Sequence, residues 1–129
     1  MNLKSLDNFS KNIKGKLRFD YCLKNHTWLN IGGNAKIFFV PETLSELRDF
    51  LLYIKNDRNN FFIIGAGSNL LISENIENRI FIKLGKNFNK ISLTKDNVVI
   101  AGCSILDKNV SEFACENHLS GLEFLSCIP

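Results

Sequence analysis

The segment best suited to chemistry is a glycine-containing loop that directly follows four apolar residues. Phe61 to Ile64 are all apolar, and Gly65-Ala66-Gly67-Ser68-Asn69 separates them from the next apolar run, Leu70 to Ile72. The glycines let the backbone approach a ligand, and successive N–H groups in such a turn can surround an anion. The side chains of Ser68 and Asn69 add donors. The segment predicts a phosphate-binding loop, although a plain turn with two glycines fits the same residues.

The common nucleotide and hydrolase motifs do not describe this loop. Leu70 stands where the dinucleotide fingerprint has its third glycine, and no lysine follows to complete a nucleoside-triphosphate loop. The hydrolase elbow requires Gly-x-Ser-x-Gly, whereas Ser68 directly follows Gly67. Ser68 is therefore not expected to be a nucleophile.

Length, composition and charge favour one cytoplasmic domain. The chain has 129 residues, of which 45% are hydrophobic, enough to supply a core. No run approaches the roughly 18 apolar residues of a membrane span, and residues 1–18 do not resemble a secretory signal. The net charge of +3 is small and dispersed, which argues against nucleic-acid binding. Four cysteines without a Cys-x-x-Cys pair, and two histidines, predict free thiols and no metal site.

Apolar spacing before the glycine loop predicts a strand–helix–strand unit. Residues 1–24 have near-helical spacing and predict an N-terminal helical arm, either a short docking helix or a frayed arm. Residues 35–40 predict a strand. Thr43 and Glu46 form a capping-box pattern, which predicts a helix that runs to about Asn56. The expected apolar face of that helix is Leu44, Leu47, Leu51 and Ile54.

Residues 61–64 then predict a strand that is covered on both faces and pairs in parallel with the first strand after a right-handed crossover. The glycine loop would lie at the carboxyl end of that strand, where open α/β sheets bind ligands. Further strands are expected over 80–84 and 98–101, with a weaker one over 90–94. A helix is expected from Asp107, as N-cap, to about Asn117, burying Val110, Phe113 and Ala114. The fold class is α/β, with α+β character.

Two further segments, together with the glycine loop, resemble the UDP-N-acetylenolpyruvoylglucosamine reductase family. They are Asn25-His26-Thr27-Trp28-Leu29-Asn30-Ile31-Gly32-Gly33 and Leu119-Ser120-Gly121-Leu122-Glu123-Phe124-Leu125-Ser126-Cys127-Ile128-Pro129. All three segments occur in the family's order at similar intervals. The resemblance covers the front part of a family whose members are about twice this length or more. It implies a FAD-binding domain over 25–129, truncated at its C-terminal end, behind the 1–24 arm.

The resemblance implies a flavin domain of the PCMH/vanillyl-alcohol-oxidase type, with a small βαβ subdomain and the start of a second, mixed subdomain. The family reduces UDP-N-acetylenolpyruvoylglucosamine to UDP-N-acetylmuramate for peptidoglycan synthesis, with hydride from NADPH passing through FAD. The implied partners are the UDP-sugar and NADPH, and the implied state is a monomer. The family's catalytic Ser, Glu and Arg lie beyond this chain, so no catalytic residue is assigned and the chain alone is expected to be inactive.

The cofactor-binding residues that the resemblance implies are Gly65, Ala66, Gly67, Ser68, Asn69, Leu70, Gly102 and Ile128. Ile31-Gly32-Gly33 lines the same site less directly or is a plain turn, and Cys103 is a weaker candidate. Trp28 is a flavin neighbour or a core residue, and Glu123 is a structural acceptor. Cys127, and Cys103-Ser104 after Gly102, stand where the family has glycines.

Two other functions fit these residues. One is the FAD domain of a different PCMH-type oxidoreductase, since the glycine loop alone is compatible with several oxidases. The other is a non-catalytic, truncated remnant that binds a phosphate or a partner without turnover.

Overall fold

The computed structural model describes residues 3–55, 61–76 and 78–128. The chain divides into two compact units, with the boundary between Gly85 and Lys86. Within the described residues, no helix is long and apolar enough to cross a membrane.

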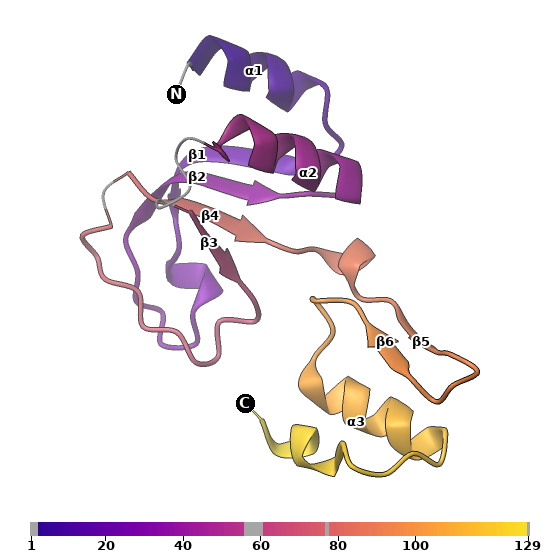
Figure 1. Ribbon diagram of the computed structural model, residues 1–129. Helices are drawn as coiled ribbons and strands as arrows, with labels where there is room; N and C mark the ends of the chain where they lie inside the picture. Colours follow the sequence, from indigo (N-terminus) through magenta and orange to yellow (C-terminus); the bar gives the residue numbers. More distant parts are fainter. Residues whose placement is uncertain (1–2, 56–60, 77, 129) are drawn as a thin grey trace. The chain divides into compact units, whose positions relative to one another are not determined.

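The first unit is a four-stranded sheet with two helices on one face (Figure 1). The strands lie in the order β1-β2-β4-β3; β1 is antiparallel to β2, whereas β4 is parallel to both β2 and β3. The elements are α1 (Leu3–Lys11), β1 (Lys16–Cys22), η1 (Lys24–His26), β2 (Asn34–Val40), α2 (Leu44–Tyr53), β3 (Phe61–Ile64) and β4 (Ile80–Lys83).

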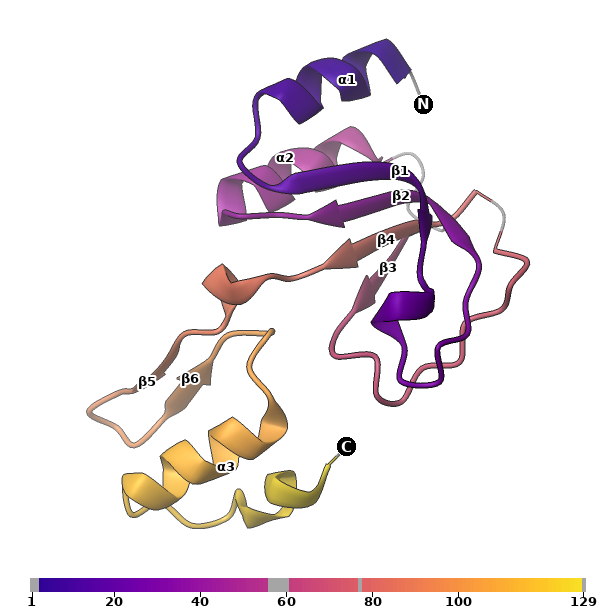
Figure 2. The same cartoon turned by 180° about the vertical axis from the view of Figure 1, so that it is seen from behind.

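Each face of this sheet has its own hydrophobic cluster, because successive strand residues point to opposite faces. The helix-covered face buries Leu6, Ile37, Phe39, Phe50, Ile54, Ile80 and Ile82. The other face buries Leu23, Ala35, Phe38, Ile64, Ile72 and Phe81. Figure 2 shows the segments between β1 and β2 and between β3 and β4 side by side, away from the helices. The second cluster therefore holds these two loop segments against the sheet.

The N-terminal segment is helical only in its first half. Helix α1 docks through Leu6, which is fully buried, as the arm prediction required. The rest of the predicted helical arm is wrong for residues 16–22, which form β1 and pair with β2 from Lys16↔Val40 to Cys22↔Asn34. Hydrogen bonding to β2 outweighs the local apolar spacing. Leu17 still packs on the cluster of the helix-covered face, but it does so from a strand. The boundary predicted after residue 24 stays a prediction.

Helix α2 begins as predicted, and Leu47, Leu51 and Ile54 of its predicted apolar face pack in the core, but Leu44 does not. Thr43 is the N-cap, and its Oγ1 accepts a hydrogen bond from the Glu46 N–H at 3.2 Å. Phe50 and Ile54 are buried, whereas Leu44, expected in the apolar face, is 73% exposed. The helix ends at Tyr53, with Ile54 as C-cap, and residue 56 lies outside the described residues.

Strand β3 follows the prediction in position and direction but not in burial or partner. It lies at the edge of the sheet, where Phe62 and Ile63 are 46% and 58% exposed. The expected direct pair of β2 and β3 is also wrong, because β4 lies between them and pairs in parallel with both. A strand later in the chain thus occupies the position that local pattern assigned to β3.

The second unit contains a hairpin and a helix. Its elements are η3 (Lys86–Phe88), β5 (Ile91–Leu93), β6 (Val99–Ala101), α3 (Asp107–Glu116) and η4 (Glu123–Cys127). Strands β5 and β6 are antiparallel, and all three predicted segments are confirmed. Leu106, not Asp107, is the N-cap of α3. Asp107 lies in the first turn, where its negative charge interacts favourably with the helix dipole.

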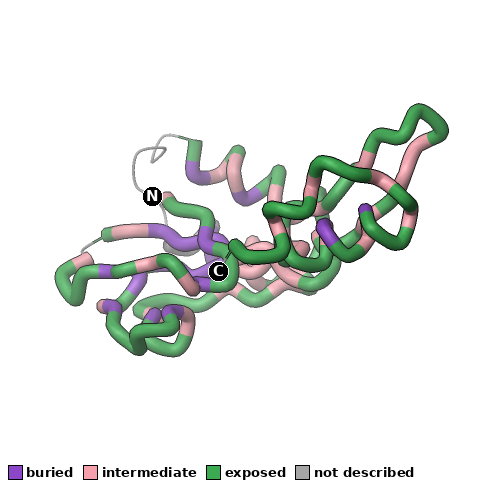
Figure 3. Tube along the Cα trace, turned by 90° about the horizontal axis from the view of Figure 1, so that it is seen from below, coloured by how far each residue is buried: buried purple, intermediate pink, exposed green. Residues whose placement is uncertain are grey.

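Burial in the second unit is shallow. Of its described residues, Ser111 and Ala114 alone are buried, and Val110 and Phe113, expected to be buried, are half-buried. Figure 3 accordingly shows mostly exposed and intermediate colours from η3 onward.

Candidate functional site

The glycine loop directly follows β3, at the carboxyl end of the parallel strands, as predicted. Gly67 is buried and has φ +80°, a left-handed backbone that favours glycine. A Cβ at this position would overlap the carbonyl oxygen of His26. The Trp28 N–H donates to the Gly67 carbonyl oxygen at 3.1 Å. The loop is therefore shaped by close contact with the segment after β1.

The backbone donors of this loop are uncommitted. Among the described residues, the N–H groups from Ala66 to Asn69 donate to no acceptor. Ala66 and Asn69 are exposed, and Ser68 is half-buried, so the donors border solvent around a buried Gly67. Consecutive unpaired N–H groups attract an anion, and a diphosphate offers several acceptor oxygens at once. The loop thus fits the diphosphate of a dinucleotide such as FAD.

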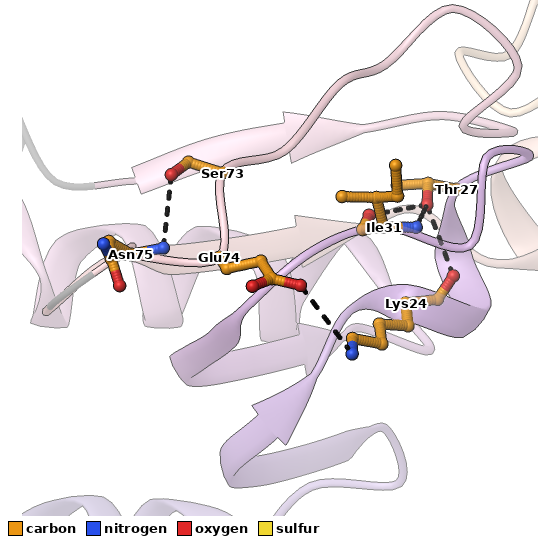
Figure 4. A network of polar contacts seen from close by, with 6 residues as sticks. All are labelled: Lys24, Thr27, Ile31, Ser73, Glu74 and Asn75. Carbon is orange, nitrogen blue, oxygen red and sulfur yellow. Dashed lines mark hydrogen bonds and ion pairs between the residues drawn. The ribbon is translucent and has the colours of Figure 1, made fainter.

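A second set of contacts joins the same two segments farther along (Figure 4). The Gly33 N–H donates to the Ser73 carbonyl oxygen at 3.1 Å, and the Lys24 ammonium lies 3.9 Å from the Glu74 carboxylate. The ion pair is exposed, so its contribution to stability is small. Gly33 is thus engaged in packing between the two loops, and both interpretations of Ile31-Gly32-Gly33 stay predictions.

Thr27 fixes the conformation of the loop between η1 and β2. Its Oγ1 donates to the Ile31 carbonyl oxygen at 2.8 Å and accepts from the Ile31 N–H at 3.2 Å. Thr27 is buried, whereas Trp28 is 70% exposed, so the loop turns the Trp28 side chain toward solvent. Trp28 is therefore not a core residue, and its position beside Gly67 agrees with the flavin-neighbour alternative.

The His26 side chain joins β1, β2 and β4 on the face that carries the loops. Its ring stacks on Phe38, with centroids 4.7 Å apart, and its Nε2 lies 3.2 Å from the Tyr21 hydroxyl. Its Nδ1 lies 3.4 Å from the Lys83 Nζ. Burial of the imidazole, followed by the positive charges of Lys83 and Arg18, lowers the pKa of His26 below 6.5. The shift therefore favours the neutral form of the ring at pH 7.

The neutral ring has one consistent proton arrangement. An ammonium group can only donate, so Lys83 donates to Nδ1 and the ring proton resides on Nε2, which donates to the Tyr21 hydroxyl. The Arg18 guanidinium lies 5.0 Å from the centre of the Tyr21 ring. Lys83 thus contacts the His26 ring directly, Arg18 contacts its Tyr21 partner, and the His26 carbonyl contacts the glycine loop.

The remaining predicted residues are distributed over both units. Leu70 packs against the loop-side cluster, so its side chain serves the core, while its backbone belongs to the loop. Gly102, Cys103, Ser104 and Ile128 lie in the second unit. A Cβ on Gly102 would overlap the Phe88 carbonyl oxygen, so a glycine is needed there for packing.

The C-terminal motif exposes Glu123, Cys127 and Ile128. The Glu123 carboxylate accepts the Gly121 N–H at 2.9 Å, which confirms its expected role as a structural acceptor. A bond from its own backbone N–H, and then the bond from Gly121, lower the pKa of Glu123. Cys127 and Ile128 are exposed, and Cys22, Cys103 and Cys115 are also free and exposed.

Sequence reasoning missed Tyr21 and Lys83, and it gave His26 no role beyond its motif. None of the three stands near the glycine loop in the sequence, and the register of β4 is needed to place Lys83 opposite Ile64. The available signal was a lysine that ends an apolar strand, since such a residue reaches the carboxyl edge of a parallel sheet.

Comparison with known proteins agrees with this geometry. The family described as "FAD binding domain" matches residues 35–129. The UDP-N-acetylenolpyruvoylglucosamine reductase of Pelagibacter ubique (strain HTCC1062) is 44% identical over 131 residues, covering 100% of this chain and 42% of that protein. The enzyme of the same name from Rickettsia typhi (strain ATCC VR-144 / Wilmington) is 44% identical over 117 residues, covering 91% and 39%.

A solved structure agrees as well. The crystal structure of UDP-N-acetylenolpyruvylglucosamine reductase from Thermus caldophilus superposes with a TM-score of 0.64 at 28% identity. The match covers 91% of this chain and 39% of that protein. The chain thus spans 42% or less of the relatives named here. The resemblance predicted from the three motifs, and the α/β fold class, are confirmed. The glycine loop, its uncommitted donors and the family match over residues 35–129 lead to one assignment: the chain belongs to the FAD binding domain family.

Proposed function

We propose that this chain is the FAD-binding part of an NADPH-dependent reductase that converts UDP-N-acetylenolpyruvoylglucosamine to UDP-N-acetylmuramate. The observation that carries the proposal is the row of uncommitted N–H groups from Ala66 to Asn69 at the carboxyl end of β3. Relatives that are 44% identical bear the name of this reductase, which supports the choice of enzyme. When bound, FAD supplies the redox chemistry.

The residues of this chain bind and orient the cofactor in this proposal. The N–H groups of residues 65–70 hold the diphosphate, and Gly67 keeps the loop close to His26 so that these donors stay aligned. Gly102 and Ile128 are proposed as backbone contacts of the cofactor from the second unit. Trp28, exposed beside the loop, offers an aromatic surface for the flavin or the adenine. No proton transfer is assigned to a residue of this chain.

The proposal extends to the surroundings of the enzyme. The UDP-sugar and NADPH are its proposed partners, peptidoglycan precursor synthesis is its proposed pathway, and the cytoplasm is its proposed location. A monomer is the proposed state.

The test is a titration of the full chain with FAD, followed by flavin fluorescence and thermal stability together. Riboflavin, which lacks phosphate, and ADP, which has the diphosphate without the flavin, serve as the two comparison ligands. We expect saturable FAD binding that stabilises the fold, competition by ADP and much weaker binding of riboflavin. A folded chain that does not bind FAD would contradict the proposal and favour the non-catalytic alternative. A different oxidoreductase would be favoured by a third outcome. In that outcome this chain binds FAD, but a longer active relative that carries this domain does not turn over the UDP-sugar with NADPH.

A further inference from the structure

The carboxyl edge of the parallel strands carries positive charge without a matching acid. Among the described residues, no carboxylate lies within 4.0 Å of Lys83 or Arg18. Lys83 is half-buried, and its Nζ lies 3.4 Å from the Nδ1 of the His26 ring. A half-buried cation held by a neutral acceptor leaves its charge available to a ligand.

This charge belongs to the strand beside the one that leads into the glycine loop. Lys83 pairs with Ile64 across the parallel ladder, and Ile64 immediately precedes Gly65. His26 contacts the loop with its carbonyl oxygen at Gly67 and holds Lys83 with its ring. The same residue thus joins the cation to the loop, while stacking on Phe38 and bonding to Tyr21 prevent its ring from turning away.

We propose that Lys83 supplies the positive charge that stabilises the diphosphate on the glycine loop, and that His26 is the positioning residue that holds the Lys83 ammonium there. The inference rests on the proposed FAD function and adds a residue from β4 to a site otherwise made of backbone donors. A diphosphate carries charge that N–H dipoles offset only in part, and a cation one strand away offsets more of it.

The first experiment measures FAD, ADP and riboflavin affinity for the full chain and for Lys83→Met, Lys83→Gln and Lys83→Arg. Lys36→Met is the matched control, because Lys36 is an exposed lysine on β2 toward the opposite, amino end of the parallel strands. We expect Met and Gln at position 83 to weaken FAD and ADP about tenfold, with Arg retaining most of the affinity. Riboflavin affinity and the Lys36→Met variant should be unchanged.

Salt provides a readout that a merely structural role of Lys83 would not change. FAD binding to the unmodified chain should weaken as the salt concentration rises, and this dependence should be shallower in Lys83→Met. Equal FAD affinity of Lys83→Met and Lys36→Met would overturn the inference while leaving the FAD function intact. Equal losses of FAD and riboflavin would also overturn it, because the effect would then be structural. An unmodified chain that binds no FAD would instead overturn the proposed function itself.

The role of His26 is tested by a pair of variants. His26→Gln keeps a side-chain acceptor for the Lys83 ammonium, whereas His26→Leu keeps the bulk without an acceptor. We expect His26→Leu to lose most of the FAD affinity that Lys83→Met loses, and His26→Gln to retain more of it. Equal affinities of the two His26 variants would overturn the positioning role.

Discussion

Gly67 is held in its conformation by the protein, in advance of any ligand. The carbonyl oxygen of His26 occupies the space that a side chain would need, and the Trp28 N–H bonds to the Gly67 carbonyl. Gly65, in contrast, has no atom within 4 Å of the position a Cβ would take. Close packing and a left-handed backbone therefore require a glycine at position 67, whereas no close contact requires one at position 65.

This contrast predicts the outcome of one pair of substitutions. We expect Gly67→Ala to lower the free energy of unfolding by about 1–3 kcal/mol, since a non-glycine residue is strained in a left-handed backbone. Overlap with the His26 carbonyl adds to that cost. Gly65→Ala is the control and should change the free energy by much less. Urea denaturation of both variants provides the measurement, and equal midpoints would contradict the account.

The His26 ring predicts a pH dependence of stability. Its pKa is lowered in the fold by burial and by Lys83 and Arg18, so between the folded value and 6.5 the unfolded chain binds more protons. The stabilisation is therefore complete above 6.5 and is lost as the pH falls below it. As the pH is lowered from about 7.5 to about 5.5, the urea midpoints should decrease more steeply than those of His26→Gln. Parallel profiles for the two proteins would disprove this explanation.

At the level of elements, one carboxylate connects the start of α2 to the segment between α1 and β1. Glu46 accepts N–H bonds from Lys14 at 2.7 Å, Glu42 at 2.8 Å and Gly15 at 3.2 Å. Burial opposes the charged form of Glu46, but these bonds outweigh it and lower the pKa below 4.5. The capping-box pattern thus predicted the helix start but not the second segment that the carboxylate holds.

Two variants test this junction. Thr43→Ala and Glu46→Gln should each lower the free energy of unfolding by about 1 kcal/mol, through loss of the cap and of the charged acceptor. Ser45→Ala, an exposed position in the same helix, is the control. The Glu46 contribution should be present above 4.5 and lost as the pH falls through its folded pKa. A Glu46→Gln protein as stable as Ser45→Ala would show that the junction contributes nothing.

The elements that sequence predicted well are those whose pattern is local. β2, α2, β4 and α3 show clear apolar patterns; Pro41 also marks the end of β2, and the Thr43 cap marks the start of α2. β1 was missed because its pairing with β2 overrides a near-helical spacing. The central position of β4 and the approach of Lys83 to His26 depend on contacts between distant segments, which single-sequence periodicity does not contain. The glycine loop was found from sequence, but the side chains behind it were not.

At the level of the whole molecule, the two units differ in how much they bury. The first contains both hydrophobic clusters, whereas the described part of the second buries Ser111 and Ala114 alone. Val98, Ile100, Leu106 and Phe124 are exposed apolar residues of the second unit. Cooperative stability follows buried apolar contacts, so the units are expected to open at different free energies.

Hydrogen exchange followed by mass spectrometry tests this difference. Amides of β2 and β4 should exchange slowest, and amides of β5, β6 and α3 should exchange faster by at least about tenfold. Saturating FAD should slow amide exchange most in the glycine loop. Equal protection of α3 and β4 in the chain without FAD would contradict the expected order.

The paired loops have a consequence for anyone who recombines this domain with its relatives. Residues 24–33 and 65–74 contact each other through Gly67 and His26, the Trp28 and Gly33 N–H groups, and the Lys24–Glu74 pair. A glycine loop grafted alone from another member would meet a neighbour shaped for a different backbone. Exchange of both segments as one block would preserve every contact between them. In a shuffled library, the surviving folded chimeras should therefore inherit the two segments from the same parent.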